Sequence, residues 1–294
     1  MKECTVCGIQ IYIKPMDIEE NIKKVVKWID IAMDKYHPDL IVLPETITTG
    51  FVPNMPKKEF YEILDFIPGK HTKKIQKAAN KHKVYTVLPI YEKGEKEDVI
   101  YNSSALISRE GEIMGIYRKT HPFATERIGG GGWTTPGYET PVFDTDIGKI
   151  GMIICYDGDF PELCRVMALK GAEIIVRPSA FLRTFDHWNL TNSARAYDNH
   201  VYFIAVNSIG LDAGGNCYYG HSMIVSPIAQ RLAQARGTEE IITATLSPDP
   251  LKYISYGSDS PQWFDHLEDR NVKAYKDILL TGKSPFEPTK RIPY

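Results

Sequence analysis

Apolar residues along the chain follow two alternating spacings, one typical of strands and the other of helices. Apolar side chains dominate 6–13, and over 18–36 they recur every three or four positions, as on one face of a helix. Asp17 begins the sequence D-x-x-E, which is typical of a helix N-cap. The run 39–45 (DLIVLPE) is short and aliphatic, so we expect a strand buried on both faces.

The same alternation continues to residue 247. Glu110-Gly111 indicates a hairpin turn between two strands. Further helices are expected at 70–83, 160–170 and 186–200. Further strands are expected at 84–92, 102–108, 112–119, 149–157, 172–179, 201–208, 222–227 and 241–247. Strands and helices in this order are typical of an α/β protein.

Two segments of the chain resemble each other. Both 38–46 (PDLIVLPET) and 171–179 (GAEIIVRPS) contain an acidic residue, an aliphatic run, a proline and then a polar residue. This echo predicts two similar halves packed against each other, not a tandem array. No Ser-, Gly- or Pro-rich linker divides the chain, so we expect one domain over 1–260.

The last residues, 261–294, have a different composition. The segment 263–280 is expected to be helical, whereas the final eleven residues contain three prolines and cannot be regular along their length. We therefore expect an extended C-terminal tail that belongs to the same domain. Such a tail is expected to pack at a subunit interface, in a homodimer or higher homo-oligomer.

Composition and charge narrow the function. The chain has 294 residues, of which 43% are hydrophobic, so it can bury a sizeable core. Its 35 basic and 37 acidic side chains give a formal net charge of -2, which favours neither nucleic acid nor a membrane surface as partner. The N-terminus lacks a signal-peptide pattern and no apolar run has the length of a membrane span, so we expect a cytoplasmic protein.

The five cysteines do not indicate a disulfide framework, because their number is odd and no secretion signal is seen. Cys4 and Cys7 form a CxxC pair that no second pair completes as a zinc site. We expect them to be structural residues on or before the first strand. No metal and no cofactor are expected.

Cys155 ends an aliphatic strand and is followed by Gly158 and Pro161, which suit a tight turn and a helix start. In α/β sheets this location faces the ligand crevice. A thiol near a helix N-terminus lies in a positive field that favours the thiolate. The turn therefore indicates an exposed nucleophile, although a buried structural cysteine fits the local sequence equally well.

Three other ionisable residues lie where strands are expected to end. Glu45 follows the run IVLP, Lys119 follows GIYR, and Glu126 lies in the glycine-rich loop after it. Each alone is most simply a solvated charge. Together with Cys155, however, they offer a base and a cation to a thiol nucleophile.

These motifs, LPET…GF, YRKTHPF…E…PG and GMIICYDGDFPE, resemble the three signature regions of the nitrilase superfamily of carbon–nitrogen hydrolases. The resemblance covers roughly Thr5 to Pro248. It implies a four-layer α-β-β-α sandwich, subunits that pair to extend it, and a catalytic triad at Glu45, Lys119 and Cys155. A second, structural glutamate would be Glu126.

In the implied mechanism, Glu45 accepts the thiol proton as Cys155 attacks a carbonyl carbon. Lys119 and the backbone N–H of Tyr156 stabilise the oxyanion, and the resulting thioester is hydrolysed. A Cys–His scheme with His121 or His221 is the alternative, but neither histidine is needed once Glu45 acts as base. The substrate pocket is expected to include four residues, Phe123, Tyr156, Ser179 and Ala180.

The local sequence favours a small, uncharged aliphatic amide as substrate. True nitrilases often place Trp-Glu after the cysteine, where this chain has Tyr156-Asp157. A substrate carboxylate, as in carbamoyl amino acids, would meet the two acids of YDGD, although Arg177 and Arg183 are possible clamps. The alternative is an N-carbamoyl amine hydrolase, followed by a nitrilase and then by a non-catalytic binding homologue.

Overall fold

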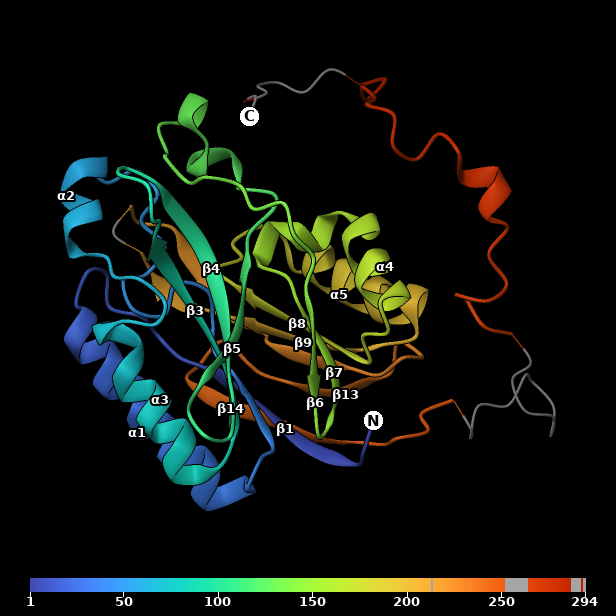
Figure 1. Cartoon of the computed structure of the whole chain (residues 1–294), viewed down its shortest axis with the longest axis horizontal. Coiled ribbons are helices and arrows are strands. Elements are labelled where there is room, and N and C mark those ends of the chain that lie inside the picture. The colour runs from blue at the N-terminus through green and yellow to red at the C-terminus, as the bar shows by residue number, and fades with distance from the viewer. Residues whose placement is uncertain (213, 252–263, 287–291, 293–294) are drawn as a thin grey trace.

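Two six-stranded sheets lie face to face in the computed structural model, which describes residues 1–212, 214–251, 264–286 and 292 (Figure 1). The first sheet has the order β14-β1-β2-β3-β4-β5, formed by β1 (Cys4–Gln10), β2 (Leu40–Val42), β3 (Tyr85–Lys93), β4 (Ile100–Ile107), β5 (Ile113–Arg118) and β14 (Glu240–Leu246). The second has the order β13-β12-β9-β8-β7-β6, formed by β6 (Val142–Thr145), β7 (Gly148–Met152), β8 (Ile174–Ser179), β9 (Tyr202–Asn207), β12 (Met223–Val225) and β13 (Arg231–Gln234). A separate pair joins β10 (Ile209–Leu211) to β11 (Cys217–Tyr219).

Helices cover the outer face of each sheet. The first sheet packs against α1 (Ile18–Tyr36) and α3 (Lys70–His82), the second packs against α4 (Pro161–Leu169) and α5 (Phe185–Asn199), and α2 (Lys57–Ile63) is a further short helix. Asp17 caps α1 as expected, because its side chain accepts a hydrogen bond from the Glu20 N–H. The expected four-layer α-β-β-α sandwich is therefore confirmed.

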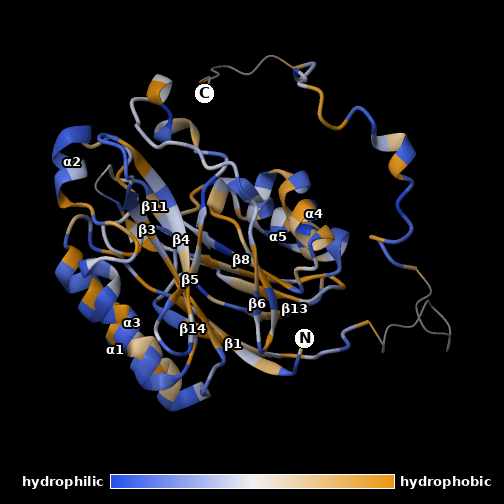
Figure 2. Ribbon diagram, viewed as in Figure 1, coloured by the Kyte–Doolittle hydropathy of each residue, from blue (hydrophilic) through white to orange (hydrophobic). Residues whose placement is uncertain are grey.

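Side chains of β1 alternate between two separate cores. Val6 packs with the second sheet in the core between the sheets, whereas Ile9 packs towards α1 and α3. Figure 2 shows the same arrangement, with apolar strands inside and polar helix faces outside. Cys4 lies in the inter-sheet core and Cys7 in the helix-facing core, so the two thiols do not share a site. The structural interpretation of this CxxC pair is confirmed.

The two sheets have the same sequence of strand pairings. From β14 to β5 and from β6 to β13, neighbouring strands pair antiparallel, parallel, parallel, antiparallel and antiparallel. In this correspondence β2 matches β8, and these are the strands of the two similar segments found in the sequence. The expectation of two similar halves packed against each other is confirmed.

Some elements differ from the sequence-based expectations. The strand expected at 149–157 ends at Met152, because the Asp157 carboxylate accepts the Ile154 N–H and bends the chain into a turn. The helix expected at 263–280 is wrong: the described part, 264–280, contains only the 3₁₀ turn Val272–Tyr275. Helical spacing there was not enough, since this segment has little surface to pack against. The final residues that carry the three prolines lie largely outside the described part.

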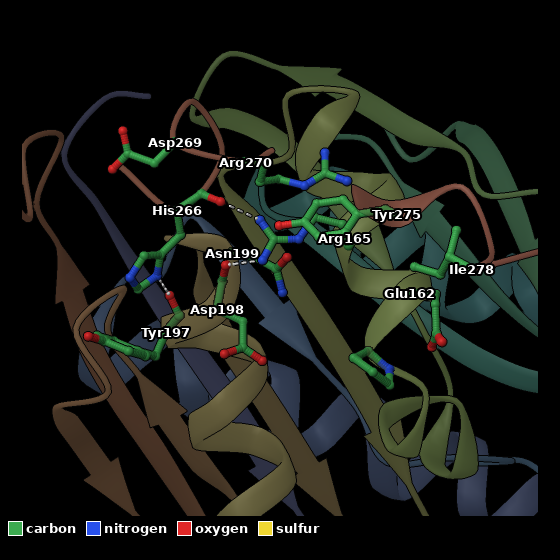
Figure 3. A pocket seen from close by; sticks show the side chains of 11 residues that line it. Glu162, Arg165, Tyr197, Asp198, Asn199, His266, Asp269, Arg270, Tyr275 and Ile278 are labelled. Carbon is green, nitrogen blue, oxygen red and sulfur yellow. Dashed lines mark hydrogen bonds between the residues drawn. The ribbon is translucent and has the colours of Figure 1, made fainter. Parts of the chain in front are cut away.

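The described tail contacts its own chain beside α4 and α5. Arg165 of α4 donates to the carbonyl oxygen of His266 (3.0 Å), and the His266 ring donates to the Tyr197 carbonyl (2.9 Å). Figure 3 shows these side chains around a groove of about 560 Å³. Further along, Leu279 and Leu280 are 92% and 72% exposed. The tail therefore anchors on the helices and then presents apolar side chains to solvent.

Candidate active site

Two loops bring Glu45, Lys119 and Glu126 together, because Glu45 lies in the loop after β2 and the other two lie in the loop after β5. Lys119, directly after β5, places its Nζ 2.8 Å from Glu45 Oε1 and 2.6 Å from Glu126 Oε2. All three side chains are fully buried. The sequence-based expectation that these charges meet is consistent with this geometry. A buried ammonium held by two carboxylates is oriented tightly, because each lost contact would leave a buried charge unpaired.

The charges of this cluster shift one another's protonation. Burial acts to lower the pKa of Lys119, but the carboxylates of Glu126 and Glu45 outweigh it, so the pKa lies above its ordinary value. Burial raises the pKa of Glu126, and Glu45 adds to this, while Lys119 opposes it. Lys119 therefore stays an ammonium group, suited to stabilise a developing negative charge.

Asn102 on β4 was not found by sequence reasoning. Its Nδ2 donates to Glu45 Oε1 (2.7 Å) and to Glu126 Oε1 (2.9 Å), so one amide group bridges both carboxylates. Backbone groups complete the set: the Ala180 N–H donates to Glu45 Oε2 and the Phe123 N–H to Glu126 Oε2, both at 2.7 Å. The only available signal was a polar residue in a strand otherwise expected to be buried.

Cys155 lies three residues after the end of β7 and adopts a left-handed backbone conformation with φ of 46°. This conformation is strained for a residue with a Cβ and is typical of functional turns. A short 3₁₀ turn, Cys155–Asp159, comes next, and α4 starts only at Pro161. Cys155 as a residue is only 8% exposed, so the expectation of an exposed nucleophile is corrected: the side chain is largely buried and borders the pocket described below.

The expected positive field of a helix N-terminus is not the dominant influence on the pKa of the Cys155 thiol. Burial raises the pKa of Cys155 well above its ordinary value, Glu45 raises it further, and Lys119 and Arg177 only partly oppose this. The expectation of a thiolate favoured by a helix N-terminus is therefore wrong, because Cys155 precedes α4 by six residues. The thiol is neutral at rest and requires a base during attack.

The two acids after Cys155 do not charge the pocket as the sequence suggested. Asp157 is fully buried and accepts the Tyr117 hydroxyl (2.7 Å) as well as the Ile154 N–H (3.0 Å). Asp159 accepts both terminal nitrogens of Arg183, at 2.7 Å each. The repulsion argument against a substrate carboxylate is therefore corrected: one acid supports the turn and the other neutralises an arginine.

A narrow pocket opens beside the thiol. Phe123, Tyr156 and Ala180 line it as expected, and Ser179 does not, since it is fully buried and its hydroxyl donates to the Arg177 carbonyl (3.3 Å). Arg183, which the sequence offered only as a clamp for a substrate carboxylate, also lines the pocket, and sequence reasoning missed the other lining residues, which are Phe51, Phe181 and Leu182. These come from the loops after β2 and β8, which only the folded chain brings to Cys155.

The histidines considered as alternative bases have other partners. His121 stacks on Phe160 with ring centroids 3.7 Å apart, and its Nδ1 contacts Asp157 Oδ1 at 3.0 Å. The His221 carbonyl accepts the Trp188 indole N–H (2.7 Å). Neither residue lines the pocket at Cys155.

Among the described residues, no group of three or more His, Cys, Asp or Glu side chains is arranged to hold a metal ion. Over the same residues, every helix is too short or too polar to span a bilayer.

The fold and the site define a carbon–nitrogen hydrolase of the nitrilase superfamily. The chain belongs to the carbon-nitrogen hydrolase family, whose model matches residues 4–253. It is thus a hydrolase that acts on C–N bonds.

Several known proteins resemble the chain over most of its length. It is 31% identical to the probable nitrilase C965.09 of Schizosaccharomyces pombe, over 95% of this chain and 99% of that protein. It is 34% identical to the omega-amidase NIT3 of Saccharomyces cerevisiae (79% and 83%) and 33% identical to a formamidase of Bacillus cereus (79% and 69%). The crystal structure of S. cerevisiae Nit3 superposes with a TM-score of 0.75 at 31% identity, covering 85% of this chain and 92% of that one.

Proposed function

We propose that the protein is an amidohydrolase that cleaves a small, uncharged aliphatic amide to a carboxylic acid and ammonia through a thioester on Cys155. The observation that carries this proposal is the Glu45–Lys119 ion pair at 2.8 Å beside a neutral, pocket-lining thiol. This arrangement offers a base, a fixed cation and a nucleophile at one point. The names of two relatives, an omega-amidase and a formamidase, support amide chemistry.

Each residue of the site has a role in the proposed reaction. As the Cys155 sulfur attacks the amide carbon, Glu45 accepts its proton, and the carbonyl oxygen becomes an oxyanion that the Lys119 ammonium and the Tyr156 N–H stabilise. Glu45 then gives that proton to the leaving nitrogen, and the C–N bond breaks to release ammonia. Glu45 next takes a proton from water as the water oxygen attacks the thioester carbon. The C–S bond then breaks to release the acid, and Glu45 returns its proton to the Cys155 sulfur, which restores the thiol.

Glu126 and Asn102 act through Lys119 and Glu45. Glu126 holds the second side of the ammonium, so that Nζ keeps one orientation through the cycle. Asn102 ties the two carboxylates together. These two residues are positioning groups in the proposal and do not touch the substrate.

The pocket supports a small and uncharged acyl group. The free space beside the thiol is about 20 Å³, and a single water molecule needs roughly 10–15 Å³ of such space. Its walls include the apolar side chains of Phe51, Phe123 and Phe181, and its one lining arginine, Arg183, already holds a carboxylate. A compact neutral amide fits these conditions better than an anion.

The test is ammonia release across matched series of aliphatic amides, N-carbamoyl amines and nitriles, with Cys155→Ala as the control for background. We expect turnover of short amides and, when hydroxylamine replaces water, formation of the hydroxamate through the thioester. Turnover of carbamoyl amines or nitriles with no turnover of amides would overturn the substrate assignment. Equal ammonia release by Cys155→Ala would overturn the nucleophile.

A further inference from the structure

A guanidinium is buried directly beneath the nucleophile turn. Arg177 interrupts the aliphatic strand β8 and is fully buried, although arginine is almost never buried without partners. Its Nη1 donates to Thr191 Oγ1 (2.9 Å) and Asn192 Oδ1 (2.6 Å) on α5, and its plane lies over Trp188, 5.1 Å from the ring centroid. The guanidinium is therefore fixed from the helix side.

The Nε edge of this guanidinium binds the backbone of the proposed nucleophile, Cys155. Arg177 Nε donates to the carbonyl oxygen of Cys155 at 2.7 Å. In a planar trans peptide, the C=O of one residue and the N–H of the next point in opposite directions. Because Arg177 fixes the Cys155 carbonyl, it also fixes the direction of the Tyr156 N–H, which points away from the guanidinium.

The turn is shaped to receive this side chain. Cys155 takes a left-handed conformation that places its carbonyl over the guanidinium, and a Cβ on residue 158 would overlap the Arg177 guanidinium carbon. Gly158 is thus required for close approach. The left-handed backbone of Cys155 is costly by itself, so the hydrogen bond from Arg177 helps to hold it.

The charge of Arg177 also bears on the sulfur. The acidic group near it is Asp159, whose Oδ1 lies 3.6 Å from Nη2 and which is shared with Arg183. Within the described residues, Nη2 makes no hydrogen bond. A buried cation with weak local compensation stabilises an anion formed nearby, because little water screens it.

From these contacts we propose that Arg177 is a positioning residue for the proposed reaction: it aims the Tyr156 N–H at the oxyanion and stabilises the sulfur when it becomes anionic. The inference rests on the proposed function for its oxyanion step, and on the structure alone for its effect on the thiol. The two contributions of Arg177 can be measured separately, because one depends on hydrogen-bond geometry and the other depends on charge.

The test compares Arg177→Met and Arg177→Lys with Arg195→Met. Arg195 of α5 is a suitable control because it is also a buried arginine that contacts the same turn, where its Nε donates to the Gly158 carbonyl (3.1 Å) and its Nη2 to the Asp159 carbonyl (3.2 Å). We expect Arg177→Met to lower kcat by about 100-fold, the scale for loss of one oxyanion donor, with KM within about threefold. Arg195→Met should lower kcat by less than about fivefold. Circular dichroism and thermal melting establish which variants fold.

A second readout does not depend on turnover. The rate of Cys155 alkylation by iodoacetamide, followed by peptide mass spectrometry, should rise with pH at a higher midpoint in Arg177→Met than in the wild type. Arg177→Lys should restore this midpoint but not kcat, because lysine supplies the charge without the planar Nε contact. If Arg177→Met does not fold, Gly158→Ala tests the same geometry, since its Cβ displaces the guanidinium and should lower kcat.

Two outcomes would overturn the proposal. One is a kcat of Arg177→Met within about fivefold of wild type, or a loss in Arg195→Met that equals it. The other is an alkylation midpoint that is the same in all variants. If the wild type hydrolyses no amide, the proposed function fails, and the alkylation midpoints still decide whether Arg177 acts on the thiol.

Discussion

The backbone N–H of Ala180 donates a 2.7 Å hydrogen bond to Oε2 of Glu45. Glu45 follows β2 in one sheet and Ala180 follows β8, the matching strand of the other. The other oxygen of Glu45 accepts the Lys119 ammonium. Both oxygens of the proposed base are therefore held, one by each sheet, and the carboxylate has a single orientation at the pocket.

The nucleophile assignment predicts that Cys155→Ala abolishes activity, by at least about 10⁴-fold, while the protein stays folded. Truncation to alanine removes the attacking sulfur and leaves the left-handed turn in place. The measurement is ammonia release together with the thermal melt. Cys164→Ala is the matched control, since Cys164 is buried on α4 and should retain activity. Comparable losses in both variants would point to damage to the fold.

Glu45→Gln and Lys119→Ala should each reduce kcat by about 10³-fold or more. The two groups are one ion pair that serves one transition state, so the double variant should lose little beyond the worse single variant. The four kcat values of the cycle provide the measurement. Losses that simply multiply would show that Glu45 and Lys119 act independently.

Asn102→Ala should lower kcat by about 10- to 100-fold, since hydrogen bonds to charged groups contribute roughly 1.5–3 kcal/mol. Loss of the amide also removes a hydrogen bond that lowers the pKa of Glu126, so this pKa should rise. The acidic limb of the pH profile of kcat is then expected to move to higher pH. Asn102→Asp should be worse than Asn102→Ala, because it adds a third carboxylate. If the pH profile of kcat is unchanged in both variants, Asn102 has no role in the proposed site.

Asp159→Asn should change the charge preference of the pocket. Arg183 would lose its carboxylate partner, and its free guanidinium would attract an anionic substrate group. We expect kcat/KM for succinamate to rise by about tenfold relative to butyramide, a neutral amide with the same length of carbon chain. The ratio of the two kcat/KM values is the readout. A constant ratio would mean that Arg183 does not face the acyl group.

Acid should weaken the contact between the tail and α5 through His200. Burial and the neighbouring His266 lower the pKa of His200. Arg165 lowers this pKa further, and Asp265 acts in the opposite direction. The unfolded chain then binds a proton at this histidine more readily than the folded chain does. Neutral His200 therefore contributes its full share of stability above pH of about 6.5, and this share is lost as pH falls below that value. His200→Asn keeps a residue that tolerates the left-handed φ of 48°. From pH 7.5 to 5.5, wild-type Tm should fall by roughly 2–4 °C more than that of the variant. If the Tm depends on pH equally in the wild type and the variant, His200 does not cause the loss of stability in acid.

We propose that the apolar part of the tail packs against a second copy of the chain. Leu279 is 92% exposed and Phe286 is 81% exposed, and apolar area gains roughly 25 cal/mol per Å² when it leaves water. Deletion of the residues after Gly282, which removes Phe286 and keeps Leu279, should weaken association and lower the Tm. Light scattering at matched concentration measures the mass of both chains. A full-length monomer at micromolar concentration would contradict the proposal, and an unchanged oligomer after truncation would place the interface elsewhere.

Sequence reasoning identified the residues that stand at strand ends, because periodicity marks where a strand stops. Glu45, Lys119 and Cys155 were found in this way. Asn102 could not be found, since its partners are 57 and 24 residues away and no local pattern marks it. The direction of the thiol pKa shift was wrong for the same reason, because it depends on burial by tertiary contacts. The pairing of Asp159 with Arg183 likewise exists only in the folded chain.

The two sheets have the same order of strand pairings, and each sheet contributes one half of the proposed site. The loops of the first sheet bring the proposed base and ammonium, and those of the second bring the sulfur and the turn beneath it. During synthesis, the first 150 residues emerge without a nucleophile, and the reactive constellation exists only once the second half closes on the first. Activity is therefore expected only from molecules in which both halves have folded together, and a half-folded molecule is expected to be silent instead of partly active.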